Sequence, residues 1–119
     1  MSSIKQDRVA ERIQMILSEL LLREVSDPRL QHITVTDVKV DAELAYANVY
    51  ISALGDESRQ NEVMTALKRA KGFLRREVAQ RVRLRSAPDL IFHWDETLER
   101  VERINRLLSS LDIPPEDKS

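Results

Sequence analysis

The residues best suited to chemistry in this chain are basic, and they lie close together. Between residues 59 and 85 there are nine Arg or Lys residues and two acidic residues, a formal charge of +7 in a chain whose total is −1. Residues 1–58 carry six basic and ten acidic residues, and residues 86–119 carry four and eight, so each range carries −4. Positive charge gathered in one segment indicates a polyanionic partner.

These basic residues also lack acidic partners at helical spacing. On a helix, Arg or Lys can pair with an acid three or four positions away. Arg59 has such a partner in Glu62, and Arg81 has one in Glu77. No acid stands at these spacings from Lys68, Arg69, Lys71, Arg75, Arg76 or Arg83. Unpaired, clustered cations repel one another, so a polyanion partner is favoured over a merely solvated helix face.

No set of residues indicates a catalytic or metal site. The chain has no cysteine, no glycine-rich phosphate loop and no nucleophile elbow. The two histidines, His32 and His93, stand 61 positions apart, and on a strand His93 points away from Trp94. Asp37 and Asp41 lack a third carboxylate at the spacing of a metal site. We therefore expect no enzyme, no metal and no cofactor.

Length and composition indicate one globular domain. The chain has 119 residues, of which 42% are hydrophobic, and this is enough for one aliphatic core. No apolar run approaches the length that spans a membrane, and no apolar signal segment follows the opening residues, so the cytoplasm is the expected compartment. We expect a single domain at 1–112 and a flexible C-terminal tail at 113–119.

Periodicity predicts the elements that precede the basic stretch. Residues 5–24 repeat apolar side chains at three and four positions and predict an amphipathic helix that ends before Pro28. Residues 33–40 and 45–54 predict two strands of a hairpin. The apolar phase changes between Val35 and Val38, which indicates either a bulge or two partly covered faces.

The second strand has two unlike faces. One face is small and apolar, as close packing against helices requires, and the other is half polar. The half-polar face carries Tyr46 and Tyr50, which could stack on RNA bases or simply pack against a helix or solvent.

The basic stretch itself has the pattern of a helix with an apolar back and a cationic front. Ser58 is the expected N-cap, and Gly72 in the middle indicates a kink, a close backbone approach or a junction between two helices. Residues 90–94 predict a third strand, and Asp95 or Thr97 is the expected cap of a last helix. The apolar positions of that last helix are Leu98, Val101, Ile104, Leu108 and Leu111.

This order of elements resembles the ribosome-binding factor A family. The similar segments are DRVAERIQMILSELLLREVSDPRL at 7–30, the strands VTDVKV and ELAYANVYIS, AKGFLRREVAQRVRLR at 70–85, and APDLIFHWDETLERVERINRLL at 87–108. The resemblance implies an α+β, type II KH-like fold, in which a mixed three-stranded sheet has helices on one face. It also implies an Ala-x-Gly kink between the two middle helices, here Ala70-Lys71-Gly72. The family's Ser-Pro-Asp-Leu turn is replaced by Asp41-Ala42-Glu43-Leu44, which leaves the geometry of that turn open.

The resemblance further implies a non-enzymatic factor that binds free 30S ribosomal subunits and 16S rRNA. Its implied role is late maturation of the small subunit and rRNA processing, with a link to growth in the cold. The implied state is a monomer off the membrane, with other assembly factors, a GTPase among them, as further partners. The alternative is a protein–protein interaction module whose basic helix docks on an acidic partner. A third hypothesis, a small hydrolase or nuclease, has no supporting motif in the sequence.

If the chain is an RNA-binding ribosome factor, its basic residues are expected to contact phosphate. Arginine can hold two phosphate oxygens with its planar fork, whereas lysine acts as a point charge. Glycine has no Cβ, so the backbone can approach RNA closely at Gly72. Selectivity then comes mostly from the shape of folded RNA. The expected RNA-binding residues are Lys68, Arg69, Lys71, Gly72, Arg75, Arg76, Arg81, Arg83 and Arg85.

Overall fold

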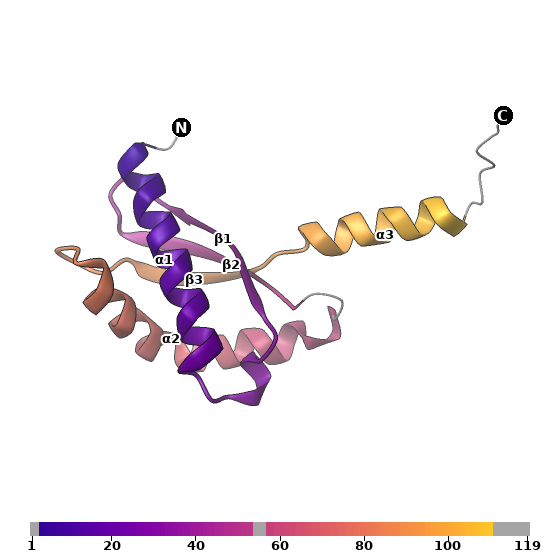
Figure 1. Cartoon of the computed structure of the whole chain (residues 1–119), viewed down its shortest axis with the longest axis horizontal. Helices are drawn as coiled ribbons and strands as arrows, with labels where there is room; N and C mark the ends of the chain where they lie inside the picture. Colours follow the sequence, from indigo (N-terminus) through magenta and orange to yellow (C-terminus); the bar gives the residue numbers. More distant parts are fainter. Residues whose placement is uncertain (1–2, 54–56, 111–119) are drawn as a thin grey trace.

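Two helices cover one face of a three-stranded sheet, and a third helix leaves the sheet after its last strand (Figure 1). The computed structural model describes residues 3–53 and 57–110, without the side chains of residues 57, 98–103 and 110. The elements are α1 (Ile4–Arg23), β1 (Thr34–Val40), β2 (Tyr46–Ser52), α2 (Gln60–Val82), β3 (Asp89–Trp94) and α3 (Thr97–Ser110). Short 3-10 turns cover Pro28–Leu30 and Glu57–Arg59.

The sheet is mixed, in the order β1-β2-β3, which confirms the expected fold class. β1 runs antiparallel to β2, and β3 runs parallel to β2. The register of β1 against β2 shifts between Val35 and Asp37. This bulge lets Val35 and Val38 both point into the core, so the change of apolar phase is explained by a bulge.

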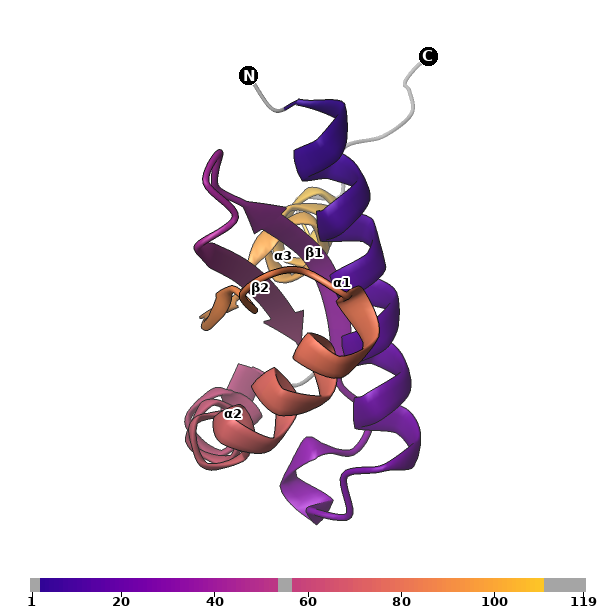
Figure 2. The same cartoon turned by 90° about the vertical axis from the view of Figure 1, so that its left-hand side faces the viewer.

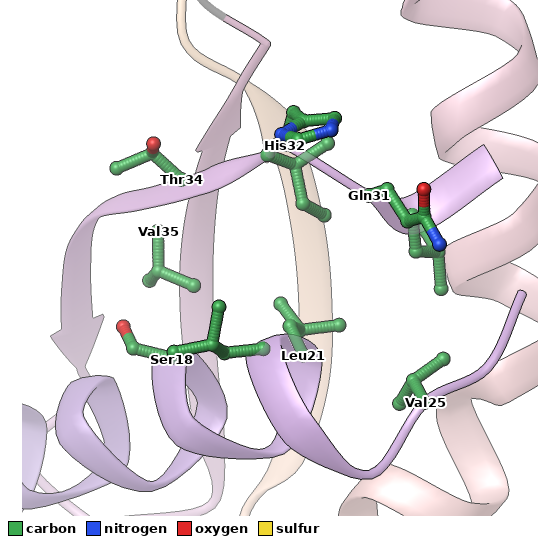
Figure 3. A pocket seen from close by; sticks show the side chains of 10 residues that line it. Ser18, Leu21, Val25, Gln31, His32, Thr34 and Val35 are labelled. Carbon is green, nitrogen blue, oxygen red and sulfur yellow. The ribbon is translucent and has the colours of Figure 1, made fainter. Parts of the chain in front are cut away.

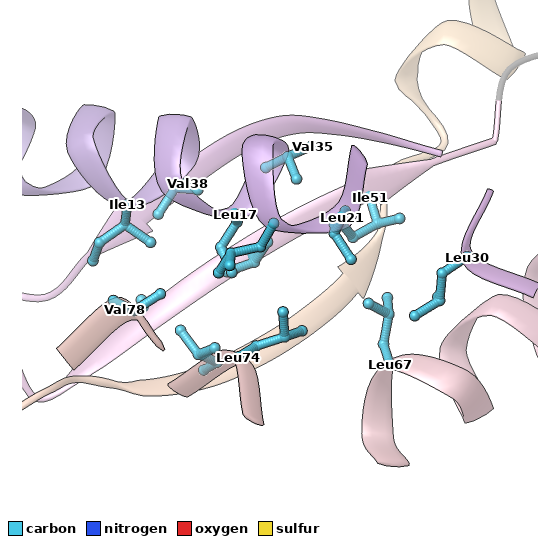
Figure 4. Packing of buried hydrophobic residues seen from close by; sticks show 14 of the residues in the cluster. Ile13, Leu17, Leu21, Leu30, Val35, Val38, Ile51, Leu67, Leu74 and Val78 are labelled. Carbon is cyan, nitrogen blue, oxygen red and sulfur yellow. The ribbon is translucent and has the colours of Figure 1, made fainter. Parts of the chain in front are cut away.

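The core lies between the inner face of the sheet and the two helices that cover it (Figure 4). Ile51 on β2, Leu17 on α1, and Leu67 and Leu74 on α2 are each 0% exposed. α1 packs mainly on β1 and α2 on β3, and the two helices also contact each other. Truncation of one such leucine to alanine typically costs about 2–5 kcal/mol, because a cavity remains.

α1 begins with a capping box and protects the free edge of the sheet. Ser3 Oγ accepts from the Gln6 backbone at 3.1 Å, and Gln6 Oε1 accepts from the Ser3 backbone at 2.9 Å. Gln6 and Gln14 also donate side-chain amides to the carbonyl oxygens of Val40 and Val35 on β1, each at 3.0 Å. These carbonyls lie on an edge strand, and such bonds keep the edge from pairing with another chain.

α2 differs in two ways from what the sequence predicts. The two middle helices expected around Ala70-Lys71-Gly72 form one element, because the helical backbone runs without a break through Gln60–Val82. Its axis nevertheless changes direction along its length: in Figure 2 one part is seen end-on while the other runs across the view. Ser58 is not the N-cap, because a 3-10 turn precedes α2 and Arg59 occupies that position without a side-chain cap bond.

α3 extends away from the layered body (Figure 1). Asp95 Oδ1 accepts from the backbone amide of Thr97, the first residue of α3, at 2.9 Å. Ile104 and Leu108, expected on an apolar face, are each 55% exposed. The side chains of Leu98 and Val101, the position of Leu111 and the expected tail at 113–119 lie outside the described residues.

The hairpin turn after β1 is fixed by Asp41. Its Oδ1 accepts from the Ala45 backbone at 2.8 Å and from the Tyr46 backbone at 2.9 Å. Leu44 has a φ of 59°, a left-handed conformation that costs energy for a residue with a Cβ. An aspartate side chain that bonds backbone amides ahead of it thus forms the turn at Asp41-Ala42-Glu43-Leu44.

Candidate nucleic-acid interface

The exposed side of α2 carries a group of cations around Gly72. Lys68 stands four positions before Gly72, and Arg75 and Arg76 stand three and four positions after it, so the four residues share one helix face. All four are exposed, whereas Leu74 on the opposite side is buried. We call this surface, made of Lys68, Gly72, Arg75 and Arg76, the Gly72 face.

Packing within the protein does not require a glycine at position 72. A Cβ built on Gly72 would meet no described atom within 4 Å. Glycine in a helix interior costs about 1 kcal/mol relative to alanine, because it loses more backbone entropy on folding. The described part of the fold therefore offers no compensation for this cost. Close approach of a partner to the backbone at Gly72 would explain why glycine is kept there despite its cost.

Two of the predicted cations are neutralised by residues that are distant in sequence or one turn away. Lys71 Nζ lies 3.3 Å from Asp89 Oδ1, at the first residue of β3. Arg81 lies 3.0 Å from Glu24 Oε2 and 3.3 Å from Glu77 Oε1. The hydrogen bond to Glu24 is the main reason that the pKa of Arg81 is raised above its ordinary value. Arg81 thus joins the end of α2 to the end of α1.

The remaining cations stay available to a partner. Arg75 donates to the carbonyl oxygen of Ala87 at 3.4 Å, a long bond to a neutral group. Within residues 3–53 and 57–110, the side chains of Lys68, Arg76, Arg83 and Arg85 have no ion-pair or hydrogen-bond partner. Six cations of the basic stretch have no acidic partner at helical spacing. Of these, only Lys71 forms an ion pair with a residue distant in the sequence in the described structure.

The predicted residues lie on two adjoining segments. Arg83 ends α2 with a φ of 59°, and it and Arg85 follow the helix as exposed residues before β3. Arg69 is exposed on α2, and its charge contributes to the low pKa of Asp27, although the two side chains form no ion pair. The residues placed on α2 itself are Lys68, Arg69, Lys71, Gly72, Arg75, Arg76 and Arg81.

A pocket lies away from this cationic surface, between the end of α1, the turn after it and the start of β1 (Figure 3). Its volume is about 460 Å³, and Leu21, Val25 and Val35 contribute to a largely apolar lining. His32 is its one ionisable lining residue, so the pocket lacks an acid–base pair. In the described ranges no three His, Cys, Asp or Glu residues are grouped to hold a metal ion.

One group of residues on the sheet was not predicted. Tyr50 stacks on His93 of β3, with ring centroids 5.0 Å apart. Alternation along β2 places Tyr46 and Tyr50 on one face, but the partner of Tyr50 depends on the parallel register of β2 and β3, which no local pattern reveals.

Among the helices that the structure describes, none is long and apolar enough to cross a membrane.

The fold and the Gly72 face define a small α+β domain of the type II KH-like class with a cationic helix surface. The sequence profile of ribosome-binding factor A matches residues 5–108. The chain belongs to the ribosome-binding factor A family, which confirms the resemblance read from the sequence. Membership in this family of assembly factors also confirms the expectation that the chain is not an enzyme.

Relatives and solved structures agree with this placement. The chain is 37% identical to ribosome-binding factor A of Natranaerobius thermophilus, over 95% of this chain and 86% of that protein. It is 44% identical to that of Chromohalobacter salexigens, over 87% and 81%. The crystal structure of ribosome-binding factor A from Thermus thermophilus superposes with a TM-score of 0.66 at 29% identity, covering 75% and 93%. Thermus thermophilus ribosome-binding factor A, as fitted into a cryo-EM map of a 30S complex, superposes with a TM-score of 0.61 at 30% identity, covering 73% and 91%.

Proposed function

We propose that this protein binds the small (30S) ribosomal subunit through the Gly72 face and contacts 16S rRNA there. The observation that carries the proposal is the exposure of Lys68, Arg75 and Arg76 around Gly72 without an acidic partner in the described structure. The related Thermus thermophilus protein has been fitted into a map of its 30S complex, which supports the same partner for this chain.

The physical basis of such binding is the exchange of counterions for protein cations. Each Lys or Arg that neutralises a phosphate releases a condensed counterion, so affinity falls as salt rises. Phosphate contacts fix position and orientation without reading bases, and folded RNA supplies selectivity through its shape. Arg83 and Arg85, exposed just beyond α2, extend the cationic surface toward β3.

The finer role that we propose is late maturation of the small subunit. The protein binds free 30S particles in the cytoplasm as a monomeric single domain at 1–112, with 113–119 as a tail, and supports 16S rRNA processing. Growth in the cold is the condition under which its loss is expected to matter most. Other assembly factors, a GTPase among them, are the expected additional partners.

Cosedimentation of the purified protein with free 30S subunits at increasing salt tests the proposal. We expect comigration that weakens steadily as salt rises, because the contacts are to phosphates. Comigration that does not change with salt would contradict a phosphate-contacting interface.

The second candidate is docking of the basic helix on an acidic protein. The same charge complementarity favours it, since Lys68 and Arg76 would pair with carboxylates as readily as with phosphates. Complete nuclease digestion of the complex separates the two functions. Binding that is lost with the RNA supports the proposed function, and binding that survives supports the protein partner.

A further inference from the structure

Outward-facing side chains form an aromatic cluster on the sheet face that α1 and α2 leave uncovered. The rings of Tyr50 and His93 stack with centroids 5.0 Å apart and planes inclined by 23°. Asn48 Oδ1 lies 2.8 Å from His93 Nε2, which orients the imidazole. The Lys39 ammonium lies 5.8 Å from the centroid of Tyr50. These contacts hold both rings in fixed orientations before any ligand arrives.

Within the described residues, the stack of Tyr50 and His93 ends on β3. The order β1-β2-β3 places Lys39, Tyr50 and His93 on successive strands, and β3 is an edge of the sheet. A planar ring can therefore continue the stack beyond His93. A second ring is offered by Tyr46, which is 50% exposed and lies four residues before Tyr50 on the same face, about 13 Å away at the ordinary strand rise.

This open sheet face is continuous with the cations of α2. Lys71 of α2 reaches Asp89 at 3.3 Å, and Asp89 is the register partner of Tyr46. The start of β3 is thus the corner at which the cationic helix and the aromatic sheet face meet. A nucleic-acid strand that follows the cations of α2 reaches Tyr46 at this corner.

We propose that the open sheet face binds one or two unpaired nucleotides of single-stranded RNA by stacking on Tyr46 and His93. This inference rests on the proposed function, because it assumes RNA at the neighbouring Gly72 face. Every base has a π-face, so stacking on aromatic side chains tolerates any sequence. Lys39 and Asp37 carry opposite charges on β1, so affinity at this face comes from stacking rather than from net charge.

The two surfaces therefore differ in what they recognise. The Gly72 face contacts phosphates and loses affinity as salt rises. The sheet face contacts bases, so its contribution persists at higher salt and disappears when the bases are absent. An RNA that engages both surfaces presents a phosphate backbone to α2 and an unstacked end or loop to the sheet.

The test uses the full chain and two fluorescently labelled oligoribonucleotides of about eight nucleotides, a length within the usual site size for single strands. One is an oligouridine, and the other is an abasic ribose-phosphate strand with the same charge. We expect the parent protein to bind the oligouridine about tenfold more tightly, as stacking of one or two bases implies. The double variant Tyr46→Leu/His93→Gln should lose this preference, whereas Tyr46→Phe/His93→Phe should keep it.

His93→Gln keeps a group that can bond to Asn48, and Tyr46 is half exposed, so both changes are compatible with the fold. Thermal unfolding of each variant checks this, and the single variant Tyr46→Leu serves if the double variant is unstable. Equal binding of both strands by the parent, with the salt dependence of phosphate contacts, overturns the sheet-face site while the proposed function stands. If the parent binds neither of the two strands nor 30S subunits, the sheet-face site and the proposed function are both overturned. A preference that survives in Tyr46→Leu/His93→Gln also overturns the site.

Discussion

Lys71 in the middle of α2 forms an ion pair with Asp89, the first residue of β3, at 3.3 Å. The pair joins the centre of the cationic stretch to the edge of the sheet, eighteen positions later in the sequence. It also places one negative charge beside the Gly72 face. Because both side chains are more than one third exposed, water screens the pair and its contribution to stability is small.

Removal of the Asp89 charge should strengthen RNA binding. In Asp89→Asn, the Lys71 ammonium is released from its partner and faces the phosphate without competition, so affinity for 30S subunits should rise by up to about fivefold. Glu11→Gln removes an equal charge from an exposed position of α1 and should leave the affinity unchanged. Isothermal titration or filter binding measures both. An affinity in Asp89→Asn equal to that of the parent and of Glu11→Gln would show that Lys71 does not contact the RNA.

Arg81 should matter more for the fold than for binding. Its guanidinium lies 3.0 Å from Glu24 and 3.3 Å from Glu77, and alanine removes both contacts. Arg81→Ala should therefore lower the Tm and reduce 30S affinity less than Arg76→Ala, which removes an unpaired charge. Paired melting and binding measurements on the two variants compare these effects. The reverse order of affinities would show that Arg81 leaves its carboxylates to contact RNA.

Gly72→Ala should separate stability from binding. The added methyl group meets no atom of the described protein, and alanine favours a helix interior over glycine by about 1 kcal/mol, so the free energy of unfolding should rise. Affinity for 30S subunits should fall, because the Cβ prevents close approach of the backbone to RNA. Denaturant unfolding and cosedimentation measure the two quantities. A stabilised variant that binds as tightly as the parent would show that the backbone at Gly72 does not touch RNA.

The Asp27–Arg29 pair should give the protein a measurable stability loss in acid. Hydrogen bonds from Arg29 hold the pKa of Asp27 at about 2, below the ordinary 3.8. A depressed folded-state pKa stabilises the protein above the unfolded value, and this stabilisation is lost as the pH falls from about 4 to about 2. Asp27 also caps the turn Pro28–Leu30, which brings Leu30 into the core.

Asp27→Asn should thus unfold at a lower temperature than the parent at pH 7, and the two curves should converge near pH 2. Melting temperatures between pH 2 and pH 7 provide the comparison. A difference that stays constant over this range would mean that the cap, and not the charge of Asp27, provides the stabilisation.

The elements of the fold were largely readable from the sequence because each has a local signal. Repetition at three and four positions found α1, alternation found β2, and Pro28 marked the turn after α1. The bulge was one of two interpretations of the phase change between Val35 and Val38. Local signals could not show that α2 is continuous through Gly72, because a glycine in a helical pattern is equally consistent with a break.

The site was predictable only as far as charge and spacing extend. The helical pattern predicted an apolar back and a cationic front, and the front includes Lys68, Arg69, Lys71, Arg75 and Arg76. The ion pair of Lys71 with Asp89 and the stacking of Tyr50 on His93 were not predicted, since both depend on how β3 is placed against α2 and β2. Contacts between elements far apart in sequence depend on tertiary packing, and no local pattern in a single sequence indicates them.

The most direct test of the Gly72 face is the affinity of a double charge reversal for free 30S subunits as a function of salt. Lys68→Glu/Arg76→Glu changes two exposed residues that lack acidic partners in the described structure, and Lys5→Glu/Arg23→Glu makes the same change in net charge on exposed positions of α1. We expect the first variant to bind at least about tenfold more weakly, with a salt dependence reduced by about one unit per lost phosphate contact. The second variant should bind like the parent. Equal affinity and equal salt dependence for both variants would contradict RNA binding at the Gly72 face.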